Sequence, residues 1–256
     1  MVTDASIAQP RVGAVRLFER HAACSKAEPA AALATMPHGS DETRVARWPR
    51  SLDRGGVRVS RSRLAVLPRS FYRRDSREVA PELLNKILLG PDGRSARIVE
   101  TEAYCGAFDE AAHTFRGKTA RNATMFGPPG HLYVYFTYGM HWCANTSCGE
   151  EGEGIGVLLR AAEPLSGLQR MHELRLRAKN DRELCSGPAR LCQAFGITRV
   201  DDGADLLGGR FRIASDGMPP PSAPAIGKRV GITRAIDAPW RFHVPGNPFV
   251  SKPWIR

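Results

Sequence analysis

Hydrophobic and polar positions divide the chain near residue 66. Over residues 1–65 no apolar period of 2 or 3.6 is sustained, and short alanine runs and scattered arginines occur instead. A segment of this kind buries too little apolar surface to fold by itself. We therefore predict that residues 1–65 form a basic arm of low order, or result from a start codon placed too early. Residues 66–256 are predicted to form one domain.

Strand and helix patterns are mixed over the predicted domain. Residues 76–84 have a helical pattern with Ser76 as the candidate cap. The β-prone runs 86–89 and 95–104 are separated by the turn signal Gly-Pro-Asp-Gly, which predicts a hairpin. The other predicted strands are 132–142, 156–161, 211–214 and 229–233, and the other predicted helices are 164–177 and 188–195. Since strands and helices do not alternate regularly, the predicted class is α+β.

The charge of the chain suggests a polyanionic partner without deciding it. The net charge is +11, and only 6 of the 37 basic residues are lysines. Arginine binds phosphate as a bidentate fork, which fits a nucleic acid, but a GC-rich genome also raises the arginine content. About half of the surplus positive charge lies in residues 1–70, so a nucleic-acid partner needs support from the remainder of the chain.

The cysteine spacing and the lack of long apolar stretches predict a protein of a reducing compartment. No stretch approaches the roughly 18 apolar residues of a membrane span. None of the six cysteines forms a C-x-x-C pair, and their spacing to histidines does not resemble a zinc site. We expect reduced thiols, no bound metal, and a location in the cytoplasm of a bacterium, close to the nucleoid, or in the nucleus of a eukaryote.

Two carboxylates share one face of the predicted strand 97–104. Period 2 places Glu100, Glu102 and Tyr104 on the same side. Two interpretations stay open: an edge strand whose carboxylates meet water, or a functional acid beside an aromatic ring. Arg160 ends the apolar run 155–159, where it either lies at the surface or balances a buried glutamate.

Four of the five tyrosines lie in two short stretches. They are Tyr104, Tyr133, Tyr135 and Tyr138. Core packing accounts for any single ring, whereas the group together is suited to stack nucleobases. His113 is a candidate base or ligand, with a purely structural role as the alternative. P-loop, G-x-S-x-G and H-E-x-x-H sequences are absent, which argues against NTPase, α/β-hydrolase and zincin classes.

Six segments follow one another in a specific order. They are RIVETEAY (97–104), DEAAH (109–113), RN…MFGPPGHLYVYFTYGMHWCAN (121–145), VLLRAAEP (157–164), SGPARLCQA (186–194) and PWRFHVPGNPFVS (239–251). Together they resemble the alkyladenine (3-methyladenine) DNA glycosylase family, from Leu67 to Lys252. The resemblance implies a curved, mostly antiparallel sheet with a protruding β-hairpin, and a monomeric enzyme that acts on double-stranded DNA without metal or cofactor.

The reaction that the resemblance implies is excision of a damaged base. Such an enzyme flips an alkylated or deaminated purine (3-methyladenine, 7-methylguanine, hypoxanthine or ethenoadenine) out of the duplex and hydrolyses its N-glycosidic bond. An abasic site remains. The only lysine near the motifs is Lys118, so Schiff-base lyase chemistry is not expected and the glycosylase is predicted to be monofunctional.

The resemblance also implies a role for each matched residue. Glu102 would activate the attacking water, and Arg160 would help to hold it. Tyr104, His113 and Tyr135 would form the walls around the flipped base. Asn145 would crowd the exocyclic amine of normal guanine, and Tyr138 would enter the minor groove as a wedge. No chemistry is assigned to Glu100.

Two alternative functions stay open at this point. One is a non-catalytic module that binds damaged DNA or another nucleic acid, which needs no carboxylate beneath the rings. The other is an enzyme of the same fold group that acts on another nucleobase or on RNA. Release of free base separates the first from an enzyme, and dependence on deoxyribose separates the second.

Overall fold

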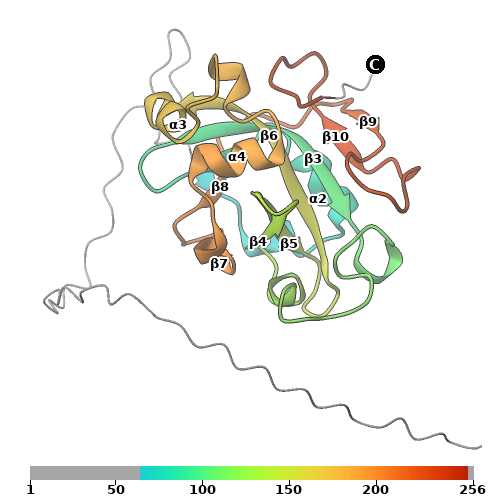
Figure 1. The fold of residues 1–256 in the computed structure, drawn as a ribbon. Helices are drawn as coiled ribbons and strands as arrows, with labels where there is room; N and C mark the ends of the chain where they lie inside the picture. The colour runs from blue at the N-terminus through green and yellow to red at the C-terminus, as the bar shows by residue number, and fades with distance from the viewer. Residues whose placement is uncertain (1–63, 253–256) are drawn as a thin grey trace, which may run out of the picture. The chain divides into compact units, whose positions relative to one another are not determined.

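The computed structural model describes residues 64–252 (Figure 1). All but the last two residues of the predicted arm over 1–65 therefore lie outside the described part. Within that part no helix is long and apolar enough to cross a membrane.

Two long strands form the middle of the sheet. β3 (Ser95–Tyr104) pairs with β6 (Ile155–Ser166) along most of its length, with register shifts next to Ser95 and on both sides of Glu100. Irregularities of this kind bend a strand and increase its twist. On its other edge β3 pairs first with β2 (Ile87–Leu89) and then with β10 (Arg241–His243), so it is an interior strand.

The sheet is antiparallel throughout its named pairings. The strand order is β1-β8-β2-β3-β6-β5-β4-β7, and β9 continues outward from β10. The remaining strands are β1 (Ala65–Val66), β4 (His131–Thr137), β5 (His141–Cys148), β7 (Ala204–Asp205), β8 (Arg212–Ser215) and β9 (Ala225–Gly227). The predicted α+β class with a curved, mostly antiparallel sheet is confirmed.

Short helices complete the hydrophobic core. They are α1 (Arg69–Tyr72), α2 (Ser76–Glu82), α3 (Leu168–Leu174) and α4 (Pro188–Phe195). In Figure 1, α4 crosses the sheet at β5 and β6, the strands with which it shares most of its contacts. The helix is the one predicted, with proline in its first turn and Gly196 in the left-handed region just after its end. One buried cluster joins α2 and α4 to the central strands, with Phe195 among its members.

The cap of α2 differs from the prediction. Asp75, not Ser76, is the cap that precedes the helix, and its carboxylate accepts from the Arg77 N–H at 2.8 Å. The Ser76 hydroxyl is buried and donates instead to the carbonyl oxygen of Tyr104 at 3.0 Å. Ser76 therefore ties α2 to the end of β3, a long-range contact that no local pattern indicates.

The predicted strand 132–142 is two strands and a turn. Tyr138 and Gly139 both have positive φ, 50° and 66°, which reverses the chain between β4 and β5. Glycine adopts such angles freely, whereas the tyrosine does so at a cost in backbone energy. The result is a hairpin with the Tyr138 side chain 75% exposed at its tip, which agrees with the expected protruding hairpin.

Two further boundaries were predicted wrongly. β6 extends to Ser166 by pairing with the start of β3, so the helix expected over 164–177 is only α3. Residues 229–233 form no strand, because their polar groups bind individual side chains rather than a neighbouring strand.

Truncating the buried Phe195 side chain at the end of α4 should destabilise the protein strongly. Phe195 is fully buried, so we expect Phe195→Ala to lower the free energy of unfolding by about 3–5 kcal/mol through lost burial and a cavity. Phe108 is 92% exposed, and Phe108→Ala should change it by less than about 0.5 kcal/mol. Urea denaturation of both variants beside the wild type checks this, and equal midpoints would contradict it.

Candidate active site

Both carboxylates of β3 are completely buried. Glu100 and Glu102 have no exposed surface. β6 and β10 pair with the two edges of β3, and Ser251 and the loop with Val230 contact the two side chains. The interpretation of 97–104 as an edge strand with solvated glutamates is therefore wrong. A buried carboxylate is tolerated only where charges or hydrogen bonds compensate its lost hydration, so the partners of each decide what it does.

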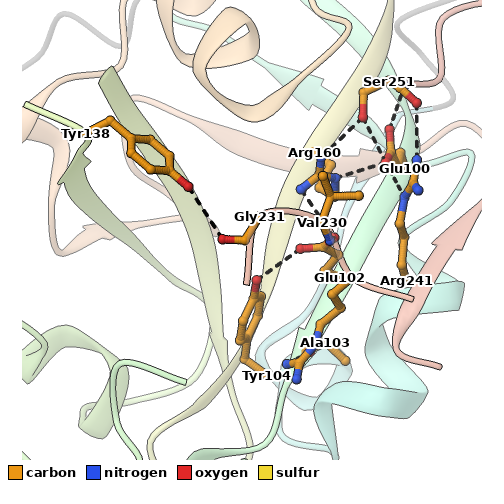
Figure 2. Close-up of polar contacts among 11 residues, drawn as sticks. Glu100, Glu102, Ala103, Tyr104, Tyr138, Arg160, Val230, Gly231, Arg241 and Ser251 are labelled. Atoms are coloured by element: carbon orange, nitrogen blue, oxygen red, sulfur yellow. Dashed lines mark hydrogen bonds and ion pairs between the residues drawn. The ribbon is translucent and has the colours of Figure 1, made fainter. Parts of the chain in front are cut away.

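Glu100 is held by two arginines and a serine. Its Oε1 atom lies 2.9 Å from Nε of Arg160 and 2.7 Å from Nε of Arg241 (Figure 2). Ser251 donates its backbone N–H to Oε2 at 2.7 Å and its hydroxyl to Oε1 at 3.0 Å. Burial alone raises the pKa of Glu100, but the two arginines and the serine outweigh it and hold that pKa below its usual value. Glu100 is thus an ionised carboxylate with hydrogen bonds to both oxygens, and through Ser251 it holds the C-terminal segment against β3.

Glu102 has a different set of partners. Nη1 of Arg160 lies 3.2 Å from its Oε1 atom, and the Val230 N–H donates to the same atom at 2.8 Å. The Tyr104 hydroxyl donates to Oε2 at 3.0 Å, as Figure 2 shows. Burial raises the pKa of Glu102 above its usual value, although Arg160 and these two hydrogen bonds oppose the shift. Glu102 is therefore the more basic carboxylate of the pair.

A cavity of about 300 Å³ lies directly beside Glu102. Six of the seven predicted site residues line it, namely Tyr104, His113, Tyr135, Tyr138, Asn145 and Arg160. Glu102 is not part of this lining, but its three partners are: Tyr104, Arg160 and Val230. The volume falls at the lower end of the range for small-ligand sites, so the cavity suits a single flat ring system.

Aromatic rings form one wall of this cavity. The rings of His113 and Tyr135 meet edge to face with centroids 4.5 Å apart, and those of Tyr133 and Tyr135 are stacked at 5.5 Å. Nδ1 of His113 lies 3.2 Å from the Tyr133 hydroxyl. Burial and the nearby charge of Arg121 lower the pKa of His113, which keeps this ring neutral at pH 7.

The side chain of Tyr138 reaches across the mouth of the cavity. Its hydroxyl lies 3.5 Å from the carbonyl oxygen of Gly231, at the limit of a hydrogen bond (Figure 2). Tyr138 stands at the hairpin tip and this hydrogen bond is weak, so moving the ring away from Gly231 breaks no hydrogen bond of the sheet.

Comparison with known proteins identifies the family. The family model described as methylpurine-DNA glycosylase matches residues 70–248. A protein of Burkholderia lata is 61% identical over 194 residues, which cover 75% of this chain and 94% of that relative; its name is "Putative 3-methyladenine DNA glycosylase". Proteins of the same name from Koribacter versatilis and Streptomyces avermitilis are 48% and 45% identical, over 97% and 90% of their lengths.

The chain belongs to the methylpurine-DNA glycosylase family. It is a DNA glycosylase, and DNA is its substrate. Residues 70–248 include both glutamates of β3, all cavity residues named above and the loop that carries Val230.

Three residues of this glycosylase site were given no individual role from the sequence. Tyr133 was named only within the group of tyrosines suited to stack nucleobases, and it lines the cavity beside Tyr135, as the alternation of side chains along β4 indicates. Arg229 and Asp109 form a fully buried ion pair behind Tyr104. No local signal predicts this pair, since the two residues are 120 positions apart.

The thiols of the glycosylase do not assemble a metal site in the described residues. Cys105, Cys143, Cys148, Cys185 and Cys192 are free and buried. No three His, Cys, Asp or Glu side chains between 64 and 252 lie together where they could hold a metal ion.

Removing the Glu100 carboxylate should destabilise the protein, whereas removing the Glu102 carboxylate should not. At pH 7 we expect Glu100→Gln to lower the free energy of unfolding by about 3–5 kcal/mol, because Arg160 and Arg241 lose their shared anion. Glu102→Gln should leave it unchanged or raise it, since a carboxylate with a raised pKa costs the folded state free energy when ionised.

The pH dependence of this difference follows from the lowered pKa of Glu100. Its stabilisation is fully present above the ordinary pKa of 4.5 and is lost as the pH falls through the lower folded value. Urea midpoints of the wild type and Glu100→Gln should therefore converge below pH 4.5. A constant difference across that range would contradict the assignment.

Proposed function

We propose that this glycosylase excises alkylated purines from double-stranded DNA by hydrolysing the N-glycosidic bond with a water molecule activated by Glu102. The observation that carries the proposal is a buried carboxylate of raised pKa lying behind an aromatic cavity. The product is an abasic site. No lysine lines the cavity in the described part of the chain, which supports a monofunctional enzyme rather than a lyase.

The cavity would hold the damaged base after it has left the duplex. N-alkylated purines such as 3-methyladenine and 7-methylguanine carry positive charge, and electron-rich rings attract such a cation by about 0.5–2 kcal/mol. Tyr104, His113 and Tyr135 present rings to the cavity, and the lowered pKa of His113 keeps a competing positive charge away. Asn145 lies at the same cavity and would crowd the exocyclic amine of normal guanine.

Glu102 would act as general base toward the water. Bond cleavage builds positive charge on the sugar, which a nearby carboxylate stabilises while it accepts the proton of the attacking water. Arg160 lines the cavity and is bound to Glu102 through Nη1, so it would orient the same water. In the free protein the Tyr104 hydroxyl occupies Oε2 and Val230 occupies Oε1. Each carboxylate oxygen can accept two hydrogen bonds, and among the described residues Oε2 accepts from the Tyr104 hydroxyl alone, so Oε2 is the atom that would accept the proton of the water.

Tyr138 would occupy the space that the flipped nucleotide leaves. Unstacking a base costs a few kcal/mol, less for a damaged pair, and an inserted ring offsets part of that cost. The side chain is exposed at the tip of the β4–β5 hairpin and borders the cavity, which supports this role.

Release of free base tests the proposed reaction. Alkylated duplex DNA is incubated with the wild type or Glu102→Gln in the presence of a chelator, and released purines and DNA binding are measured separately. We expect release by the wild type alone, with binding to an abasic-site analogue retained by the variant. Binding without release by either protein would favour a binding module, and release by Glu102→Gln at the wild-type rate would remove Glu102 from the mechanism.

Substitution of Tyr138 tests the wedge. Because stacking on a base contributes about 1–3 kcal/mol, Tyr138→Ser should bind damaged duplex more weakly by a corresponding factor and flip the base more slowly. Leu176→Ser is the matched control, since Leu176 is 89% exposed and does not line the cavity. Affinity by fluorescence anisotropy and single-turnover excision measure both effects. Unchanged values for Tyr138→Ser would exclude the wedge.

A further inference from the structure

The loop that contains Arg229, Val230 and Gly231 belongs to no strand, and it contacts three residues in or around the site. Arg229 binds Asp109, the N–H of Val230 binds Glu102, and the carbonyl oxygen of Gly231 accepts from Tyr138. The position of this loop therefore affects the orientation of the Glu102 carboxylate, because Val230 binds it.

Arg229 is the anchor of the loop. Its guanidinium makes a bidentate pair with Asp109, at 2.5 Å and 2.8 Å, and both side chains have no exposed surface. It also donates to the carbonyl oxygen of Ala103 at 3.0 Å, on the strand that carries Glu102. Its Nε–H is buried and has no hydrogen-bond partner within residues 64–252. Burying this charge pair with one unsatisfied donor costs free energy, and hydrophobic residues would fill the same space at lower cost.

The same guanidinium fixes the ring of Tyr104. Its central carbon lies 4.7 Å from the Tyr104 ring centroid and 4.9 Å from that of Trp240, within cation–π distance of both. The hydroxyl of this Tyr104 ring binds Oε2 of Glu102, and the residue next to Arg229 binds Oε1. Two of the three groups that hold Glu102 thus depend on the place of Arg229, and Arg160 is the third.

Asp109 extends this arrangement to the aromatic wall. Its carboxylate accepts from the backbone N–H groups of Cys105 at 3.2 Å and Ala111 at 3.1 Å. These bonds shape the loop that leads from Tyr104 to His113, both of which line the cavity. The carboxylate therefore receives donors on every side, and an amide in its place would turn an N–H₂ group toward some of them.

We infer that Arg229 and Asp109 are positioning residues, which set the orientation of the Glu102 carboxylate by fixing Val230 and the Tyr104 ring against it. The inference rests on the proposed role of Glu102 as general base. Neither residue touches the reacting atoms. Both act through the Val230 N–H and the Tyr104 hydroxyl, which donate hydrogen bonds to Glu102.

A purely structural role is the alternative, and the chain offers a matched control for it. Arg97 and Asp216 also form a buried ion pair, with Nη2 and Oδ2 2.7 Å apart and side chains only 9% and 12% exposed. Neither residue lines the cavity or contacts Glu102. Asp216→Asn therefore breaks a comparable pair, and only the general loss of stability is shared with Asp109→Asn.

The rate of excision at saturating enzyme and its dependence on pH test the inference. Single-turnover release of base is measured for both variants over a pH series. We expect Asp109→Asn to lower the plateau rate by about 10- to 100-fold, the size of loss typical of a displaced catalytic group. The acidic limb should shift to higher pH, because the Val230 and Tyr104 hydrogen bonds that lower the pKa of Glu102 are weakened. Asp216→Asn should show neither change.

The other charged and titratable groups around Glu102 stay in place in this comparison. They are Arg160 of β6, Cys143 of β5, Arg241 of β10, and Glu100 and Tyr104 of β3 itself. Arg229 also interacts electrostatically with Glu102, and losing the Asp109 charge beside it would by itself lower the pKa of Glu102. A shift of the acidic limb to higher pH therefore reports a change in how Glu102 is held.

A second variant decides the question if Asp109→Asn fails to fold. Arg229→Lys keeps the charge but loses the bidentate fork and the flat face toward Tyr104. It should give a folded protein with the same two changes in smaller degree. Wild-type plateau and acidic limb in a folded Asp109→Asn or Arg229→Lys would overturn the inference, as would equal loss in Asp216→Asn.

The proposed function and this inference fail in distinguishable ways. If Glu102→Gln excises at the wild-type rate, the role of Glu102 is wrong and the positioning role falls with it. If Glu102→Gln is inactive while Asp109→Asn and Arg229→Lys behave as wild type, only the positioning role is wrong.

Discussion

Arg160 lies within ion-pair distance of both buried carboxylates of β3, and the chemistry of the site depends on how its charge is shared. Glu100 has a second arginine, Arg241, and two bonds from Ser251, so its pKa falls. Among the described residues no second arginine forms an ion pair with Glu102, so burial prevails and its pKa rises. Two chemically identical groups on one strand thus become a structural anion and a candidate base because of their environments alone.

This division of charge requires segments that are distant in the sequence. β6 supplies Arg160, β10 supplies Arg241, and the loop after β9 supplies Val230. The bent antiparallel sheet allows this, because β3 changes its partner from β2 to β10 along one edge where the carboxylates begin. The fold by itself does not specify a reaction; the family membership and the cavity beside Glu102 together support base excision.

The sequence correctly predicted the elements that are determined by residues close together in the chain. The hairpin of β2 and β3 follows from its turn residues, and α4 follows from its early proline and terminal Gly196. Boundaries set by tertiary contacts were wrong. β6 continued past Pro164 because it pairs with β3, and 229–233 became a loop because its polar groups bind Asp109 and Glu102.

The sequence by itself determined the fold class, the family resemblance and six of the side chains that line the cavity, because ordered motifs and strand periodicity record them directly. Only the tertiary structure decided that Glu100 and Glu102 are buried, that Arg160 lies between them, and that a distant ion pair lies behind Tyr104. The physical reason is that burial and pKa depend on which charges approach through space. A pattern of residues along one strand contains no information about the charges that other strands and loops bring to it.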